Sequence, residues 1–336
     1  MTTRNKPRRR NGTGRTRRSS SPPSALPDRR LMEQQMATIG RLLEGREFDS
    51  LEDVNAYLHD VLGEGDGQLP AIEPRTPLER AQALVYQALE ASGPRRIKLA
   101  RQALAISAEC ADGYVLLAEA ARDPHEIRNL YEQGVQAGER ALGPEVFGEA
   151  AGHFWGMVET RPYMRARRGL AEVLWAMGER QAAIGHLQEL LRLNPGDNQG
   201  VRYPLAIWLL SEGDLAAVER LLDQYPDEIT ASWAYTRALV LFRRRGAGKQ
   251  VDQVLVRALE INPFVPQYLL GAKRPRSLPE YVGIGDESEA IDYVAGAHRL
   301  WFEQNEAVDW LVAVIARRLP RLLARPTPSP RTIYPR

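Results

Sequence analysis

Residues 164–195 read MRARRGLAEVLWAMGERQAAIGHLQELLRLNP, and this stretch decides the fold. Small and apolar residues sit at fixed places on either side of Gly178, which is typical of two amphipathic helices joined by a turn. The positions that set the pattern are Leu170, Ala171, Leu174, Gly178, Ala183, Leu187, Leu190 and Pro195. The stretch therefore predicts a helical hairpin.

The same spacing returns further along the chain. Gly178 recurs as Gly213 and Gly246, at separations of 35 and 33 residues, and Pro195 recurs as Pro263, 68 residues further on. This order of helix, turn and helix resembles the tetratricopeptide repeat (TPR), whose period is about 34 residues. The resemblance implies an all-α fold, a right-handed solenoid of TPR-type helical hairpins in which each pair buries its apolar face against the next.

Composition sets the class of protein. With 336 residues and 43% hydrophobic content the chain can bury a large core. No apolar run is long enough to span a membrane and no secretory signal is recognisable, so we expect a cytoplasmic protein. The single cysteine, Cys110, has no second thiol to pair with, and we expect it to be a small buried side chain.

The charge is unevenly distributed. Residues 1–30 carry ten basic residues and one acid, a net of +9, which leaves 35 basic and 42 acidic residues, a net of −7, for the rest. Because residues 1–30 hold almost no apolar side chains, they predict a disordered basic arm. Such an arm can bind nucleic acid or an anionic surface by neutralising negative charges such as phosphates. The alternative is that it only keeps the chain soluble.

Breaks in the pattern divide the chain into segments. Glycine and proline are dense at 63–75, and the array is interrupted within 138–161 by Gly143, Gly148, Gly152 and Gly156. We predict a disordered basic arm (1–30), short N-terminal helices and a linker (31–75), front TPR-like helix pairs (76–137), an irregular insertion (138–161), a regular TPR array (162–265), an interrupted repeat with a capping helix (266–325) and a disordered tail (326–336).

Local patterns predict some details of these segments. Thr76 followed by Pro77 is typical of a helix start. The aromatic cluster at 153–155 can cover a ligand, but aromatic side chains in such insertions more often seal the gap between mismatched repeats. Residues 31–43 predict an amphipathic helix. Its apolar stripe consists of Met32, Met36, Ile39 and Leu43.

By resemblance to the TPR family, the first helix of each pair lines a concave groove. The residues that the family's groove positions and their neighbours assign to this chain are Arg165, Arg168, Trp175, Arg202, Tyr203, Trp233 and Arg237. Arginines beside aromatic rings suit a peptide that carries carboxylates, through bidentate pairing and stacking. A solvated charged face is the alternative. The family's carboxylate clamp of lysines and asparagines is not reproduced, so a chaperone C-terminus is not the expected ligand.

A narrower resemblance rests on three segments. They are NPFVPQYLLG at 262–271, GDESEAIDY at 285–293 and NPGDNQGVRY at 194–203. These segments resemble bacterial tetratricopeptide proteins distantly related to the suppressor-of-tumorigenicity-seven family. That family has no well-established catalytic activity, so the resemblance implies more about the fold than about the function.

Catalytic, metal and cofactor patterns are missing from the sequence. The five histidines have no metal-ligand spacing, and GAGKQ at 246–250 does not fit a phosphate loop. We therefore predict a non-enzymatic scaffold or adaptor, with no cofactor, that binds a peptide or helix of an unidentified protein in the groove. The alternative is a nucleic-acid-associated adaptor that uses residues 1–30. An enzyme built on the insertion at 153–155 is the third and least favoured reading.

Overall fold

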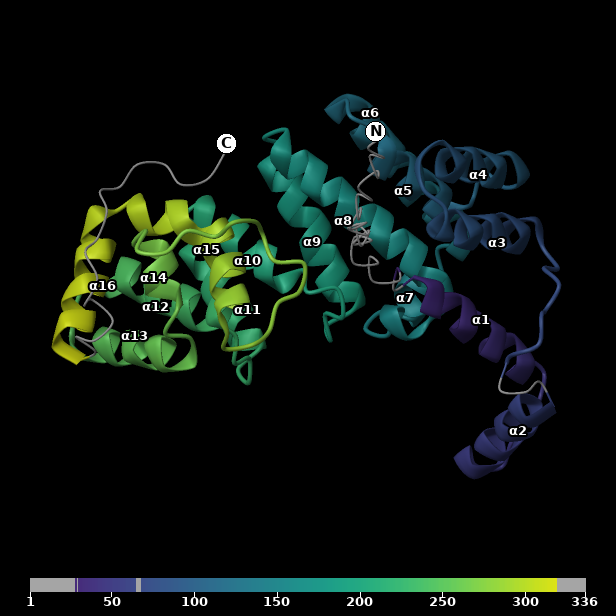
Figure 1. Cartoon of the computed structure of the whole chain (residues 1–336), viewed down its shortest axis with the longest axis horizontal. Coiled ribbons are helices and arrows are strands. Elements are labelled where there is room, and N and C mark those ends of the chain that lie inside the picture. Colours follow the sequence, from purple (N-terminus) through teal and green to yellow (C-terminus); the bar gives the residue numbers. More distant parts are fainter. Residues whose placement is uncertain (1–27, 29, 65–67, 319–336) are drawn as a thin grey trace, which may run out of the picture.

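The computed structural model describes residues 28, 30–64 and 68–318, and every regular element in these residues is a helix (Figure 1). The helices before the insertion are α1 (Leu31–Leu43), α2 (Leu51–Glu64), α3 (Pro77–Glu90), α4 (Gly93–Ile106), α5 (Ala111–Ala120) and α6 (Pro124–Leu142). The insertion contains α7 (Val146–Glu149), η1 (Phe154–Gly156) and η2 (Val158–Thr160). Then follow α8 (Arg161–Ala176), α9 (Arg180–Leu193), α10 (Arg202–Ser211), α11 (Leu215–Gln224), α12 (Ala231–Arg245), α13 (Lys249–Ile261), α14 (Val265–Leu269), α15 (Glu287–Phe302) and α16 (Asn305–Arg318).

Consecutive helices pack in pairs, and the pairs stack from α3 and α4 at one end to α16 at the other (Figure 1). The hairpin predicted at 164–195 is the pair α8 and α9. Gly178, Gly213 and Gly246 end the first helices of three successive pairs, with φ angles of 87°, 77° and 69°. This left-handed conformation is open to glycine without strain, which explains why glycine recurs with the repeat. The predicted all-α array of helical hairpins is confirmed.

Side-chain caps fix the starts of two helices in the front part of the array. The hydroxyl of Thr76 accepts a hydrogen bond from the backbone N–H of Glu79 at 3.1 Å, and Pro77 occupies the first turn of α3. The carboxylate of Asp123 accepts the N–H of Glu126 at 3.1 Å at the start of α6. Each cap satisfies a backbone donor that the helix leaves free.

The core runs through the array as one large cluster of apolar side chains, with a smaller one under α3, α4 and α5. Cys110 belongs to the smaller cluster and is fully buried, as predicted. Burial raises the pKa of its thiol to about 12. Because the thiolate is the reactive form, Cys110 is an inert packing residue.

The irregular insertion begins later than the sequence suggested. Helix α6 runs through Gly138 to Leu142, and the break comes at Gly143, whose φ is 76°. Gly138 is a packing residue: a Cβ there would lie 2.7 Å from the Cβ of Tyr163 on α8. Within the insertion, Phe154 is fully buried and its ring lies 6.3 Å from that of Tyr163. Phe154 therefore packs the insertion onto α8, with the ring of Phe147 also 5.3 Å away.

The N-terminal helix α1 docks through a different face from the one predicted. Met32 and Met36 are 65% and 42% exposed, whereas Glu33 is 6% exposed. The predicted stripe is wrong at both methionines because α1 lies on a charged part of the array, where Glu33 meets arginine side chains. Arg30, next to α1, pairs with Asp28. The rest of the predicted arm, like the predicted tail at 326–336, lies outside the described residues.

At the other end, α15 lies across the first helices α10 and α12. Thr236 and Val240 of α12 are buried. Helix α16 begins at Asn305, within the segment for which the sequence predicts a capping helix. No helix in the described part of the chain is both long and apolar enough to cross a bilayer.

Candidate functional site

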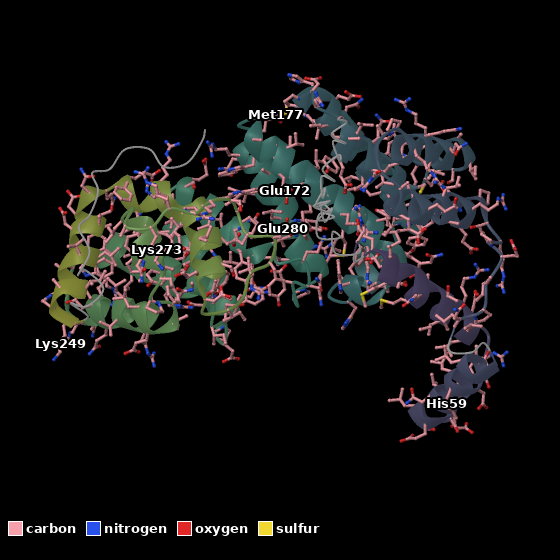
Figure 2. All side chains as sticks on the ribbon, in the orientation of Figure 1. His59, Glu172, Met177, Lys249, Lys273 and Glu280 are labelled. Carbon is pink, nitrogen blue, oxygen red and sulfur yellow. The ribbon has the colours of Figure 1, made fainter. Side chains whose placement is uncertain are left out.

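The candidate site is the face lined by the first helices of the pairs. At the front, α1 lies on this face against α3 and η2, and at the back α15 covers α10 and α12. A Cβ on Gly296 of α15 would lie 3.9 Å from the Cγ1 of Ile207 on α10. The part between these two covers is formed mainly by α8. Figure 2 shows Glu172 on this helix near the middle of the array, and its side chain is 55% exposed.

Arg165 is the centre of a buried ion cluster under α1. Its guanidinium donates to both carboxylate oxygens of Asp112 on α5, at 2.9 and 2.7 Å, and to both oxygens of Glu33, at 2.8 and 2.9 Å. Arg161 lies 3.6 Å from Glu33, and Gln82 donates to Asp112 at 2.9 Å. The predicted site residue Arg165 is thus saturated by the chain's own carboxylates.

Burial and pairing act in opposite directions on the two carboxylates. Burial raises the pKa of Glu33 above its usual value, although Arg165 and Arg161 offset part of that effect. Burial also acts on Asp112, but its contacts with Arg165 outweigh burial and hold the pKa below its usual value. Asp112 is therefore the ionised partner on which Arg165 depends, and Glu33 is held less strongly in its charged form.

Arg168 and Trp175 remain partly accessible on α8. The Arg168 side chain is 40% exposed; it donates to the carboxylate of Glu172 at 2.9 Å and to the backbone carbonyl of Gln199 at 2.7 Å. The ring of Trp175 stacks on that of Trp208 of α10 with centroids 4.5 Å apart. The guanidinium of Arg180 also lies over the Trp175 ring, 4.4 Å from its centroid, so Arg168 is the more accessible of the two predicted residues on α8.

Arg202 and Tyr203 form a clamp between two loops that join neighbouring pairs. The guanidinium of Arg202 pairs with Asp197 at 3.2 Å and with Glu228, and it lies 4.6 Å from the ring centroid of Tyr203. The Tyr203 hydroxyl donates to Glu228 at 3.1 Å, and the ring of Tyr225 lies 5.0 Å from Arg202. Both predicted residues are thus brought together, and the terminal nitrogens of Arg202 and the hydroxyl of Tyr203 are already engaged.

Trp233 is buried, which corrects its assignment as a ligand contact, whereas Arg237 is partly exposed and reaches to α11. Trp233 is 2% exposed and donates its indole N–H to the carbonyl of Tyr225 at 3.1 Å. Arg237 donates to the carbonyl of Leu222 and to Asp223, at the C-terminal end of α11. The ring of Trp233 lies edge-on to the rings of Tyr203 on α10 and Tyr225 after α11, with centroids 5.7 and 5.9 Å apart, so the stacking of neighbouring pairs encloses it.

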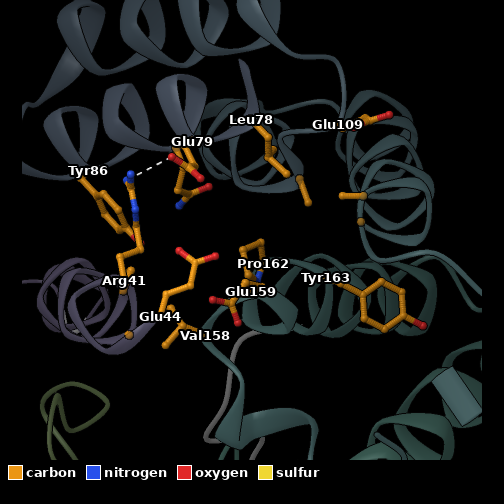
Figure 3. Close-up of a pocket in the computed structure, with 16 residues that line it drawn as sticks. Arg41, Glu44, Leu78, Glu79, Tyr86, Glu109, Val158, Glu159, Pro162 and Tyr163 are labelled. Atoms are coloured by element: carbon orange, nitrogen blue, oxygen red, sulfur yellow. Dashed lines mark ion pairs between the residues drawn. The ribbon is translucent and has the colours of Figure 1, made fainter. Parts of the chain in front are cut away.

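A cavity of about 480 Å³ lies beside α1, and Figure 3 shows residues that line it. Arg41 of α1 pairs across it with Glu79 of α3 at 3.0 Å. Sequence reasoning missed this cavity because its walls come from α1, α3, α6 and η2, which no local pattern connects. The sequence feature that could have pointed to the cavity is Gly40, a glycine inside a predicted helix. A Cβ at this position would meet nothing within 4 Å.

Comparison with known proteins places the chain in a family. A model of the family described as ST7 protein matches residues 79–335, well over half of the 336 residues. The chain belongs to the ST7 protein family. This confirms the family part of the resemblance that the sequence segments carried. The matched range of this ST7 family member includes every helix from α5 to α16.

Curated ST7 relatives are longer than this chain. The Suppressor of tumorigenicity 7 protein-like protein of Bos taurus is 30% identical over 227 residues, which cover 61% of this chain and 41% of the relative. The ST7 homologues of Drosophila melanogaster and Caenorhabditis elegans are both 27% identical, over 65% and 69% of this chain and 45% and 50% of their own lengths. The chain thus spans half or less of the curated relatives it matches.

Among solved structures, the crystal structure of YrrB is titled as that of a TPR protein with an unusual peptide-binding site. It aligns with a TM-score of 0.37 at 15% identity and covers 67% of this ST7 family chain and 92% of YrrB. The fold assignment rests on the helix pairs described above. Within the described residues, no group of three or more histidine, cysteine or acidic side chains is arranged to hold a metal ion.

Proposed function

We propose that this ST7 family chain is a non-enzymatic protein-interaction scaffold that binds a helix or extended segment of a partner protein on the open part of its concave face. The observation that carries the proposal is α1 itself. This helix is seated on the same face through the carboxylate of Glu33 and the guanidinium of Arg165. The face therefore already accepts a helix through carboxylate–arginine pairing, the chemistry that the sequence predicts for a partner.

Arg168 is the residue best placed to make the corresponding contact with a partner. Arg165 and Arg202 are each held by two carboxylates of the chain, so they are structural. The pair of Arg168 with Glu172 is exposed, and exposed pairs contribute only about 0–1 kcal/mol, so a partner carboxylate can replace Glu172 at little cost. Trp175, on the same helix, is already in contact with Trp208 and Arg180, so Arg168 is the main contact that α8 offers a partner.

Site-specific photo-crosslinking tests which face binds. A photoreactive amino acid is placed in the full chain at Glu172 on α8 or at Gln188, an exposed residue on α9 of the outer layer. Partner adducts are then collected from cells and identified by mass spectrometry. The proposal predicts adducts of the same protein from position 172 and none from position 188. Adducts from position 188 alone would place the binding surface on the outer layer.

The nucleic-acid reading rests on the basic charge of residues 1–30, a net of +9. If this segment binds DNA or RNA, the logarithm of the affinity falls linearly with the logarithm of the salt concentration, because counterions are released from the phosphates. The slope should be lost when residues 1–27 are deleted. A slope that survives the deletion would place any nucleic-acid contact elsewhere. A cytoplasmic location and a bacterial origin stay predictions from the sequence.

A further inference from the structure

The cavity beside α1 has the shape and lining of a site for a long side chain. One wall is the C-terminal half of α1, where Ala37 and Gly40 leave the space open. The inner wall holds apolar groups and tyrosine rings, among them Leu78, Val158, Pro162, Tyr86 and Tyr163. A volume of about 480 Å³ far exceeds what one water occupies, which is about 30 Å³.

The charged groups around this cavity are mostly acidic. Glu44, Glu79, Glu109 and Glu159 line it together with a single cation, Arg41, a formal charge of −3. Arg41 pairs with Glu79, and Glu44 pairs with Arg75. Within the described part of the chain, Glu109 and Glu159 form no ion pair. An apolar wall with carboxylates at the rim fits a lysine or arginine side chain, whose aliphatic stem packs while the charged end meets the acids.

A segment of the chain itself has the complementary charge and begins next to α1. Residues 1–27 contain eight lysines or arginines and no acid. The chain leaves the array at Arg30, which pairs with Asp28 and with Glu119. A stretch of ten extended residues spans at most about 35 Å, whereas Leu31 and Gly40 are about 14 Å apart along α1. Basic residues as far back as Arg15 can therefore reach the cavity.

We propose that the cavity beside α1 binds a basic side chain of residues 1–27 of the same molecule, at the carboxylates of Glu109 and Glu159. The basic segment then folds back over α1 and presses this helix onto the array. Such binding withdraws positive charge from any outside anionic partner. A partner that binds the basic segment would free the cavity, and a partner that binds the acidic rim would free the basic segment.

Carbodiimide cross-linking of the full chain tests this proposal directly. Replacing Arg15, Arg17 and Arg18 by lysine keeps the charge and supplies amines that couple to a carboxylate in contact. The expected product is an amide between one of these lysines and Glu109 or Glu159, located by mass spectrometry in the monomer at every protein concentration. The ion pair of Lys273 with Glu287 supplies an internal reference for the coupling.

Two glycine variants provide the matched control. Gly40→Leu fills the cavity, and Gly185→Leu makes the same change at a helical glycine of α9; a Cβ meets nothing within 4 Å at either site. We expect the cross-link yield at Glu109 and Glu159 to fall at least about ten-fold in Gly40→Leu and to persist in Gly185→Leu. Equal yields in both variants, or coupling spread evenly over other carboxylates, would overturn the proposal. Products found only in dimers would assign the site to a second copy instead.

Discussion

At Arg165 two carboxylates converge from different helices, Asp112 of α5 and Glu33 of α1. Asp112 is 1% exposed and keeps a pKa below its usual value, while burial raises that of Glu33. A buried pair is strongly destabilising only when one partner is removed and the other stays charged. The two acids should therefore contribute unequally to stability at neutral pH, although both touch the same guanidinium.

Neutral substitutions of the two acids should separate these roles. Asp112→Asn should lower the free energy of unfolding at pH 7 by about 3 kcal/mol, because it leaves the Arg165 charge poorly paired. Glu33→Gln should cost about 1 kcal/mol or less, because burial raises the pKa of Glu33 and so offsets part of what its carboxylate gains from Arg165 and Arg161. Urea unfolding of the two variants and wild type measures both values. Equal losses would show that Glu33 is as firmly ionised as Asp112.

The pH dependence of the same variants has a defined sign. A lowered folded-state pKa means that Asp112 contributes stability above the ordinary aspartate value, about 3.9, and loses it as the pH falls through the lower folded value. The raised pKa of Glu33 acts the other way, since its contribution is present at low pH and is lost as the pH rises through the folded value. The difference in unfolding free energy between wild type and Asp112→Asn should thus disappear below about pH 4. A difference that stays constant to pH 2 would contradict this.

His186 should give a second, separate acid transition. Burial and the nearby Arg167 lower the pKa of His186 to about 4. Folding therefore holds it neutral, and its contribution to stability is present above about pH 6.5 and lost as the pH falls towards 4. His186→Gln should reduce the stability lost between about pH 6.5 and pH 4 by about 1 kcal/mol, after allowance for solvent screening. His125→Gln, at an exposed site on α6, should keep the wild-type loss.

At the scale of the elements, α6 and α8 pack closely against each other at two glycines. A Cβ on Gly138 of α6 would lie 2.7 Å from the Cβ and 3.1 Å from the Cα of Tyr163, and one on Gly169 of α8 would lie 2.3 Å from the ring of Tyr131. The sequence shows these residues only as glycines inside apparent helices. Their packing role follows from the partner helix, which a single sequence does not show.

Alanine at these glycines should reveal which of them the packing needs. Gly138→Ala should destabilise the protein by about 1–3 kcal/mol, because the backbone of Tyr163 must shift. Gly185→Ala, where nothing lies within 4 Å, should stabilise it by about 0.5–1 kcal/mol through helix propensity. Thermal unfolding compares the two. If Gly138→Ala proves neutral or stabilising, α6 and α8 are not packed as closely as described.

For the whole molecule, periodicity predicted the hairpins well, because Gly178, Gly213 and Gly246 each mark a backbone turn that few other residues adopt. The repeat position also assigned each residue to a face of its own helix. It could not show what covers that face. Glu289 of α15, for example, accepts the backbone N–H of Ala231 at the start of α12, 58 residues earlier, at 2.8 Å. Contacts of this range leave no local signal in a single sequence.

Helix α2 should be the least protected helix of the molecule. It projects away from the array (Figure 1), and none of residues 51–63 is buried. Amide protection reflects the free energy of local opening, which is low where few apolar contacts hold an element. Hydrogen exchange followed by mass spectrometry should therefore show α2 exchanging well before α12. Equal protection of the two helices would mean that another surface covers α2 in solution.

Two arginines of nearly equal exposure test the central claim that partners bind the open concave part of the array. The side chain of Arg168 is 40% exposed on that part. The side chain of Arg237, on α12 and in contact with the end of α11, is 41% exposed. The measurement is the dissociation constant of a photo-crosslinked partner segment for Arg168→Glu and Arg237→Glu. We expect at least about ten-fold weaker binding for Arg168→Glu, a loss of about 1.4 kcal/mol in binding free energy, and little change for Arg237→Glu. Unchanged binding by Arg168→Glu, or an equal loss in both variants, would contradict it.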